Sequence, residues 1–465
     1  MSGEHKRTGT FYFHLRGISM KKSANFQSAV SGAPFGRIMK TEFVNHASFI
    51  VSAGSVKLMC DPWLEGSAFH NGWSLIAASR FGYERFSEIT HIRFSHEHPD
   101  HFSPPNLKKI PEAERKRIAI LFQKTKGKKV IDYCRSIGFE HIRELGRNWE
   151  TIAPGFRIIN RPHTDGDSWL CIETEGKRLL NVNDCNLESD AEVRDIARAI
   201  GGGADILFTQ FSYANAMGNR ADTAVRARFA EAKIDEIRRQ IRILKPEHVV
   251  PFASFVWFSH EENFFRNDAI NTVEKARDEI EKAGATAVIL YNGDTRKPGE
   301  KHNSDAALKK WSESYAEGIS EALTAKAARI DVSDLTAAAS AFCQRLRKKN
   351  SFLIRFWLQP TYIYVRDLKC AFRLSLDGLH HAETHPDHCD VQLGSEALHY
   401  CFKFEWGGST TRINGRYETG PSGKFYRFKR YFLISQINNR RESLGLTYAA
   451  EYGKSVLTSR RIIKD

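Results

Sequence analysis

The chain has 465 residues with a formal net charge of +14, and its isoelectric point is about 9.3. Hydrophobic residues make up 41% and charged residues 27%, which is typical of a folded globular protein and excludes wholesale disorder. The length predicts two or three domains, and the positive charge favours anionic ligands: phosphorylated or nucleotide-linked metabolites, nucleic acid or an acidic membrane surface.

The spacing of cysteines and of apolar residues excludes several further classes of protein. None of the eight cysteines stands in a Cys-x-x-Cys pair, so neither a zinc ribbon nor a redox dithiol is predicted. The first forty residues lack the apolar core of a secretory signal, so we expect reduced thiols and a cytoplasmic location. Because no run of 18 apolar residues occurs, no membrane span is expected.

The predicted elements follow an extension over residues 1–38, which is polar, basic and poorly periodic. Strands are predicted over 41–51, 56–60, 87–94, 156–160, 169–174, 178–183, 205–210, 248–252 and 286–291. Helices are predicted over 125–137, 221–244 and 272–283. The longest helix has apolar residues at helical spacing up to Leu244, and Pro246 marks its end.

This order of elements predicts an α/β domain over residues 39–300, in which helices cover sheets. Residues 301–350 are predicted to form a helical connector. Residues 351–465 are aromatic-rich and basic, and we expect a C-terminal α+β domain there. From Thr411 onward, twelve Lys or Arg stand against four Asp or Glu, which indicates a solvated basic surface or one that binds anions.

The strongest motif is Ser-His-Glu-His-Pro-Asp-His at residues 95–101, directly after a predicted strand. Imidazole and carboxylate groups at this density suit zinc, iron or manganese. We expect His96 and His98 to hold one metal ion, and Asp100 and His101 to face a neighbouring one. Two such ions, about 3.5–4 Å apart, can share a hydroxide. The structural alternative is a polar surface loop that happens to be rich in histidine.

The His-x-His-x-Asp-His spacing is the signature of the metallo-β-lactamase superfamily, which the first predicted domain resembles. The resemblance implies an αββα sandwich and further ligands. His163, after a predicted strand, matches the third ligand of the first metal ion, and Asp184 matches the carboxylate that bridges two ions. The alternatives are an ordinary loop histidine and a helix N-cap, respectively.

Two further positions follow from the same resemblance. Relatives often carry a histidine two residues after a strand-ending proline, but Pro251 is followed by Phe and Ala. His260 is therefore predicted as the substitute ligand. Asp61, at the end of a strand, matches the aspartate that lies beneath the ligands and orients them. The alternative for Asp61 is a turn-forming Asp-Pro.

A narrower resemblance rests on residues 45–49 (Asn-His-Ala-Ser-Phe), 61–64 (Asp-Pro-Trp-Leu) and 183–185 (Asn-Asp-Cys). They are similar to the β-lactamase-like part of CMP-N-acetylneuraminate hydroxylases. More distantly, they resemble ascorbate-6-phosphate lactonases and the phospholipase D that cleaves N-acyl-phosphatidylethanolamine. Those hydroxylases also carry a Rieske domain with Cys-x-His and Cys-x-x-His pairs, and no cysteine here has a histidine two or three residues on.

A second histidine cluster comprises His380, His381, His385, Asp387 and His388. Its His-Pro-Asp-His sequence repeats that of residues 98–101, but Glu383 occupies the place of the first histidine. We expect an ordinary loop there rather than a metal site.

Three functions are weighed from the sequence. The favoured one is a binuclear metal-dependent hydrolase that attacks a phosphorylated, nucleotide-linked or lactone substrate through a metal-bridging hydroxide, with Asp100 accepting a proton. Zinc is the favoured metal, with iron or manganese as alternatives, and nucleic acid is a less favoured substrate. The second is a diiron oxygenase that uses a separate electron-donor protein. The third is a non-catalytic binding role.

Overall fold

The computed structural model describes residues 39–439 except 126, 164–165, 320–323 and 353. The predicted extension over residues 1–38 and the end of the predicted C-terminal domain, residues 440–465, lie outside the described residues. Within the described part, no helix is both long enough and apolar enough to cross a membrane.

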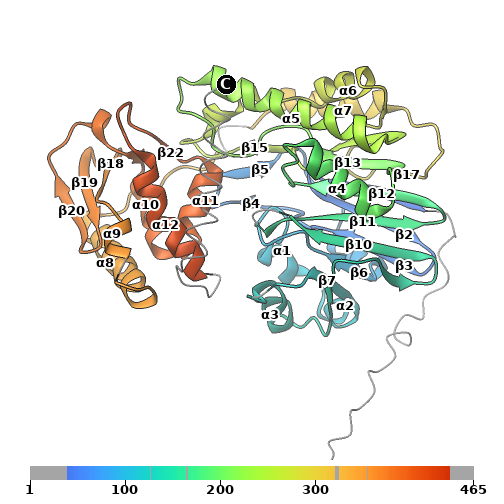
Figure 1. Ribbon diagram of the computed structural model, residues 1–465, viewed down its shortest axis with the longest axis horizontal. Coiled ribbons are helices and arrows are strands. Elements are labelled where there is room, and N and C mark those ends of the chain that lie inside the picture. The colour runs from blue at the N-terminus through green and yellow to red at the C-terminus, as the bar shows by residue number, and fades with distance from the viewer. Residues whose placement is uncertain (1–38, 126, 164–165, 320–323, 353, 440–465) are drawn as a thin grey trace, which may run out of the picture. The chain divides into compact units, whose positions relative to one another are not determined.

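The first of two seven-stranded sheets is built mainly from the earliest strands of the chain (Figure 1). In spatial order its strands are β17 (Thr295–Arg296), β1 (Lys40–Asn45), β2 (Ser48–Ala53), β3 (Val56–Cys60), β6 (His91–Arg93), β7 (Ala119–Gln123) and β8 (His141–Leu145). The single strand predicted over 41–51 is wrong, because the chain turns at His46 and Ala47 and returns as β2. Neither Gly nor Pro marks that turn, which is why a single strand was predicted across it.

The second sheet is built from later strands and stacks on the first. Its spatial order is β16 (Thr286–Ala287), β14 (His248–Phe252), β13 (Ile206–Gln210), β12 (Lys177–Asn183), β11 (Ser168–Thr174), β10 (Phe156–Pro162) and β9 (Glu150–Ala153). The strand predicted over 248–252 is confirmed at both ends, whereas the one predicted over 286–291 is only two residues long.

Helices cover the outer faces of the two sheets (Figure 1). Those over the first sheet are α1 (Pro104–Lys109), α2 (Glu112–Arg117) and α3 (Lys129–Ser136); those over the second include α4 (Asp190–Ile200), α5 (Thr223–Leu244) and α6 (Val273–Lys282). A short 3₁₀ helix, η1 (Tyr83–Glu88), precedes β6 and takes up the first two residues of the strand predicted over 87–94, of which only β6 is strand. The predicted αββα sandwich is confirmed.

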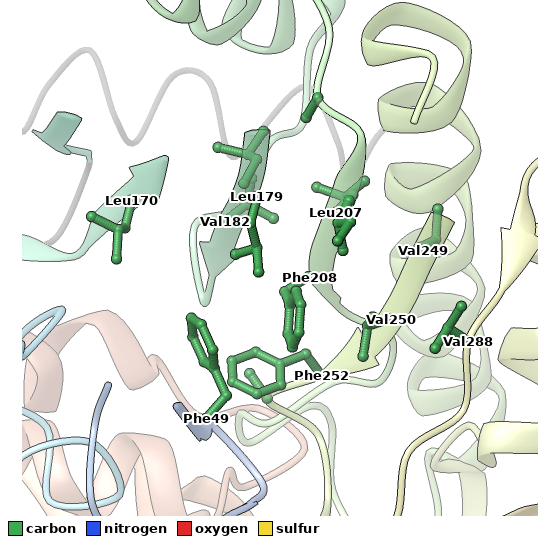
Figure 2. Packing of buried hydrophobic residues seen from close by; sticks show 14 of the residues in the cluster. Phe49, Leu170, Leu179, Val182, Leu207, Phe208, Val249, Val250, Phe252 and Val288 are labelled. Carbon is green, nitrogen blue, oxygen red and sulfur yellow. The ribbon is translucent and has the colours of Figure 1, made fainter. Parts of the chain in front are cut away.

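The core lies between the sheets, and strand alternation builds it. Phe43 and Phe49 point into the space between the sheets, whereas their neighbours Val44 and Ile50 belong to a second cluster beneath α1 and α3. Figure 2 shows Phe49 against Phe208 and Phe252 at the centre of this core. The rings of Phe49 and Phe208 stack with centroids 4.8 Å apart.

A buried arginine ties the two sheets together beneath the functional loop. Arg93, the last residue of β6, is fully buried. Its guanidinium donates to the Asn160 side chain and to the Ser168 carbonyl, at 2.7 and 2.8 Å, and both acceptors belong to the second sheet. Burying an arginine is tolerated here because several acceptors receive its N–H groups.

The C-terminal part has its own core and its own sheet. The sheet order is β20 (Gly378–Ala382), β19 (Cys370–Ser375), β18 (Thr361–Val365), β21 (Val391–Leu393) and β22 (Tyr417–Glu418). Its helices are α8 (Val332–Lys349), α9 (Ile354–Trp357), α10 (Ser395–Lys403), α11 (Gly407–Asn414) and α12 (Phe425–Asn439). In the region predicted as a connector, α7 (Ser304–Glu317) packs into the first core and α8 into the second.

Candidate metal centre

The histidine loop at residues 95–101 starts two residues after β6 and is held from below by Asp61. The Ser95 N–H donates to Oδ1 of Asp61 at 2.7 Å, and Oδ2 of Asp61 lies 3.1 Å from Nδ1 of His101. Asp61 itself has a positive φ of 45° and is fully buried. One aspartate therefore contacts both the first and the last residue of the loop.

The structure brings four of the predicted residues into two groups that could each hold a metal ion. One group is His96, His101 and Asp184, and the other is His46, Asp100 and His101. Nε2 of His101 lies 3.1 Å from Oδ2 of Asp184 and 3.2 Å from Oδ2 of Asp100. Because His101 belongs to both groups, the two candidate positions are adjacent.

The residues present fit metal ions. Oδ1 of Asp100 and Oδ1 of Asp184 are both buried, and neither has a hydrogen-bond partner among the described residues. A buried carboxylate oxygen without a partner is costly, and a cation removes that cost. Asp184 is the accessible member of the set: its side chain is 22% exposed, against 0 to 3% for Asp100, His101 and His96.

His98 lies beside the groups rather than in them. Its Nδ1 is 2.7 Å from Nε2 of His96, and its ring meets the edge of the Phe69 ring at a centroid distance of 5.6 Å. Burial, helped by the neighbouring His96, lowers the pKa of His98 to about 3. His98 is thus neutral at neutral pH, which is the form that binds metal.

His101 and Asp100, unlike His98, are held in their charged forms. Burial lowers the pKa of His101, but the carboxylates of Asp100 and Asp184 outweigh it and hold that pKa well above its ordinary value. Burial raises the pKa of Asp100, and His101 and His46 outweigh it and hold the Asp100 pKa well below the usual range. In the metal-free chain His101 therefore carries a proton that a metal ion must displace.

Sequence reasoning gave His46 no role in the site, although it lies in one of the motifs. The turn between β1 and β2 presents it, and the Phe255 N–H donates to its Nδ1 at 3.2 Å. A neutral imidazole that accepts at Nδ1 carries its proton on Nε2. That Nε2 lies 3.4 Å from Oδ2 of Asp100 without forming a hydrogen bond to it, and we expect this close contact to orient the carboxylate.

Asp167 is a second residue that the sequence did not single out. It is buried, and its Oδ1 lies 3.2 Å from Nδ1 of His96. Burial lowers the pKa of His96, but Asp167 outweighs that effect and raises it. A carboxylate on Nδ1 fixes the imidazole so that Nε2 faces the metal. The only sequence signal was a second aspartate four residues after His163.

His163 and His260 are not in either group. Nε2 of His163 donates to the Asn186 carbonyl at 3.0 Å. His260 lies against two glutamates, with Nδ1 3.7 Å from Glu262 and Nε2 3.9 Å from Glu396. Their roles as ligands stay predictions. The second histidine cluster, on β20 and the short 3₁₀ helix η4 (Pro386–His388), supplies no ligand group among the described residues.

A strained turn at residues 69–71 lies next to His98. Strands β4 (Ser67–Ala68) and β5 (Trp73–Leu75) pair with β15 (Val256–Phe258) in a small sheet. Between β4 and β5, Phe69, His70 and Asn71 have φ of 51°, 56° and 58°. Each left-handed non-glycine residue costs roughly 1–2 kcal/mol, so a run of three needs support from its surroundings.

Comparison with curated proteins identifies relatives of the chain. The cytidine monophosphate-N-acetylneuraminic acid hydroxylase of Mus musculus is 26% identical over 240 residues, covering 49% of this chain and 40% of the mouse protein. A Homo sapiens protein, named as an inactive form of that hydroxylase, is 26% identical over 240 residues, covering 49% and 46%. The chain is a metallo-β-lactamase-fold protein related to these hydroxylases. It spans less than half the length of these relatives.

Family models and solved structures were also compared with this metallo-β-lactamase-fold protein. No family model matches it. CmlA, a diiron β-hydroxylase from Streptomyces venezuelae, is 17% identical with a TM-score of 0.39, covering 57% of this chain and 55% of CmlA. An isothiocyanate hydrolase from Delia radicum gut bacteria is 16% identical with a TM-score of 0.41, covering 56% and 98%.

Proposed function

We propose that the chain is a two-metal hydrolase that acts on an anionic small molecule. The observation that supports it most is that two adjacent ligand groups share His101, with a free carboxylate oxygen in each of Asp100 and Asp184. His96, His98, Asp100, His101 and Asp184 would hold the metal ions. When bound, the two ions supply Lewis acidity and a water acidified towards neutral pH.

The side chains of the chain have separate parts in this reaction. Asp100 is the proposed proton acceptor, and His101, whose Nε2 lies 3.2 Å from Oδ2 of Asp100, keeps this carboxylate in place. Asp184 is the more exposed of the two carboxylates, so a substrate would reach the metal ions past its side chain. Asp61 and Asp167 fix the rings of His101 and His96, so that the ligands need little rearrangement.

The proposed substrate class rests on charge and on the relatives. The net charge of +14 attracts anions and raises their local concentration. The names of the relatives refer to a sugar acid linked to cytidine monophosphate, so a nucleotide-linked acid is the first class to test. Phosphodiesters, phosphorylated sugars and lactones form the remaining panel.

The test begins with protein purified without added metal. We expect about two zinc or manganese ions per chain, no visible absorption band, and hydrolysis of a phosphodiester or a lactone. The double variant His96→Ala, Asp100→Ala should abolish turnover while keeping the far-ultraviolet circular dichroism. If the double variant turned over substrate as fast as the natural chain, catalysis by this site would be ruled out.

Oxidation is the second candidate, because the relatives are named hydroxylases. Histidine and carboxylate ligands serve iron as well as zinc. This alternative requires an electron donor, and we propose a separate donor protein for that part. Two irons per chain, with a visible band that bleaches on reduction, would favour oxidation over hydrolysis.

A further inference from the structure

The left-handed turn at residues 69–71 is held by the C-terminal part of the chain. The Asn414 side chain, at the end of α11, donates to the Phe69 carbonyl at 2.8 Å. The Arg416 guanidinium donates to the His70 carbonyl at 3.2 Å and lies 3.1 Å from Nδ1 of the same residue. Both holding residues are fully buried.

The fit between the turn and Asn414 is close. A β-carbon at Gly72 would lie 2.4 Å from Cβ of Asn414, so only glycine allows this approach. Asn263 completes the arrangement, because its amide donates to the Gly72 carbonyl at 2.9 Å and to the Asn414 carbonyl at 2.7 Å. The turn and the end of α11 are therefore built as one unit.

The turn in its left-handed form brings the Phe69 ring to His98. Phe69 is 3% exposed, and its ring also meets that of Trp73 at 4.5 Å. Among the described residues, hydrogen bonds to the His98 ring come from His96 alone. Phe69 is thus the other ring that limits where His98 can point. A return of Phe69 to negative φ would move its side chain off His98.

We propose that Asn414 and Arg416 are positioning residues for His98, because they hold the left-handed turn that keeps Phe69 against this histidine. The inference rests on the proposed metal-binding function. It assigns the C-terminal part a role in the metal centre, although none of the proposed ligands belongs to it. The loss of either positioning residue lowers the affinity for metal without removing any ligand.

The test compares two asparagine substitutions at the same junction. Asn414→Ala removes the contact with Phe69. Asn219→Ala is the matched control, because Asn219 makes two hydrogen bonds of 2.8 Å to the backbone of Thr419 in the C-terminal part and none to the turn. Zinc affinity and stoichiometry are measured by competition with a chromophoric chelator, and the cobalt(II) spectrum reports the ligand field.

We expect Asn414→Ala to weaken zinc binding at one position by about 10–100-fold, the range for residues that orient ligands, and to shift the cobalt spectrum. Asn219→Ala should stay within about threefold of the natural chain even if its melting temperature falls equally. Phe69→Ala should reproduce the effect of Asn414→Ala, and it replaces that variant in the test should Asn414→Ala fail to fold. The proposal would be overturned if Asn414→Ala, or Phe69→Ala in its place, bound zinc as tightly as Asn219→Ala does.

The outcomes separate this inference from the proposed function. If the natural chain binds no metal, both fail. If it binds two metal ions but hydrolyses nothing in the panel, the proposed activity fails while the affinity comparison still decides the role of Asn414. If it binds metal and Asn414→Ala, or its replacement Phe69→Ala, behaves like Asn219→Ala, only the positioning role fails.

Discussion

His101 and Asp184 are 83 positions apart in the sequence, yet Nε2 of the histidine lies 3.1 Å from Oδ2 of the aspartate. We expect Asp184→Asn to lower the metal content from two ions to one, since the amide cannot supply a charged oxygen to the group that Asp184 forms with His96 and His101. Turnover should fall by more than the roughly 10–100-fold typical of residues that only orient a ligand. Metal analysis and steady-state kinetics measure the two effects.

Glu97→Gln is the control for that variant. Glu97 lies in the same loop and also loses a negative charge, but its side chain is exposed and it belongs to neither ligand group. It should keep two metal ions and full activity. A similar loss in both variants would mean that Asp184 acts through general charge rather than as a ligand.

His46→Ala tests the orienting contact with Asp100. The structure predicts metal binding weakened by about 10–100-fold with the stoichiometry unchanged, because Asp100 remains but is no longer fixed. Isothermal titration measures the affinity. His248→Ala, a substitution of a half-buried histidine on β14, should leave the affinity unchanged. Loss of one whole metal ion in His46→Ala would show instead that His46 is a ligand.

His260→Gln tests the remaining predicted ligand. Because His260 lies against Glu262 and Glu396, we expect the variant to keep two metal ions and its affinity for them. Elemental analysis of the purified variant decides the question. A content of one ion per chain would return His260 to the ligand set and require movement of the segment that carries it.

His91 gives the fold a pH dependence of known sign. Burial, with a smaller contribution from Arg143, lowers the pKa of His91 from about 6.5 to about 4. Between these values the unfolded chain binds a proton that the folded chain does not. Stability therefore falls as the pH decreases from 6.5 towards 4, by at most about 1.4 kcal/mol per pH unit from this residue.

Urea unfolding between pH 4.5 and 7 measures this contribution. His91→Gln has no such proton, so its stability should depend less steeply on pH than that of the natural chain. The comparison uses slopes, since the substitution also changes packing on β6. Parallel curves would assign the pH dependence to other groups.

Phe208→Ala tests the core between the sheets. Phe208 is 1% exposed and packs against Phe49 and Phe252 (Figure 2). Its removal should cost about 3–5 kcal/mol of unfolding free energy by denaturant titration. The same substitution at Phe229, which is 38% exposed on α5, should cost much less. Equal losses would contradict the placement of Phe208 in the core.

The parts of the site that the sequence predicted are local. Residues 96–101 form one contiguous loop, and Asp184, which the family resemblance indicated, directly follows a strand that contains Leu179, Leu180 and Val182. His46 and Asp167 were not predicted to belong to the site because their roles depend on long-range contacts, with Asp100 and His96 respectively. A local sequence pattern does not predict which side chain will contact a residue that is distant in the sequence.

The C-terminal part shows a second limit. The aromatic-rich sequence from residue 351 is typical of strands, but helices α10 to α12 form much of this part of the chain. Helix α11 begins with two glycines, which are poor helix formers. A β-carbon at Gly408 would lie 2.3 Å from the Phe432 side chain, so close helix packing favours glycine there over local propensity.

The two ligand groups draw on both layers of the sandwich. The turn that carries His46 and the loop from His96 to His101 belong to the first sheet, whereas Asp184 follows β12 of the second. A bound pair of ions would therefore connect the two layers, and it would stabilise the folded chain by an amount that grows with the logarithm of metal concentration. Removing the ions with a chelator would then lower the melting temperature, which would report directly on how fully the proposed site is occupied.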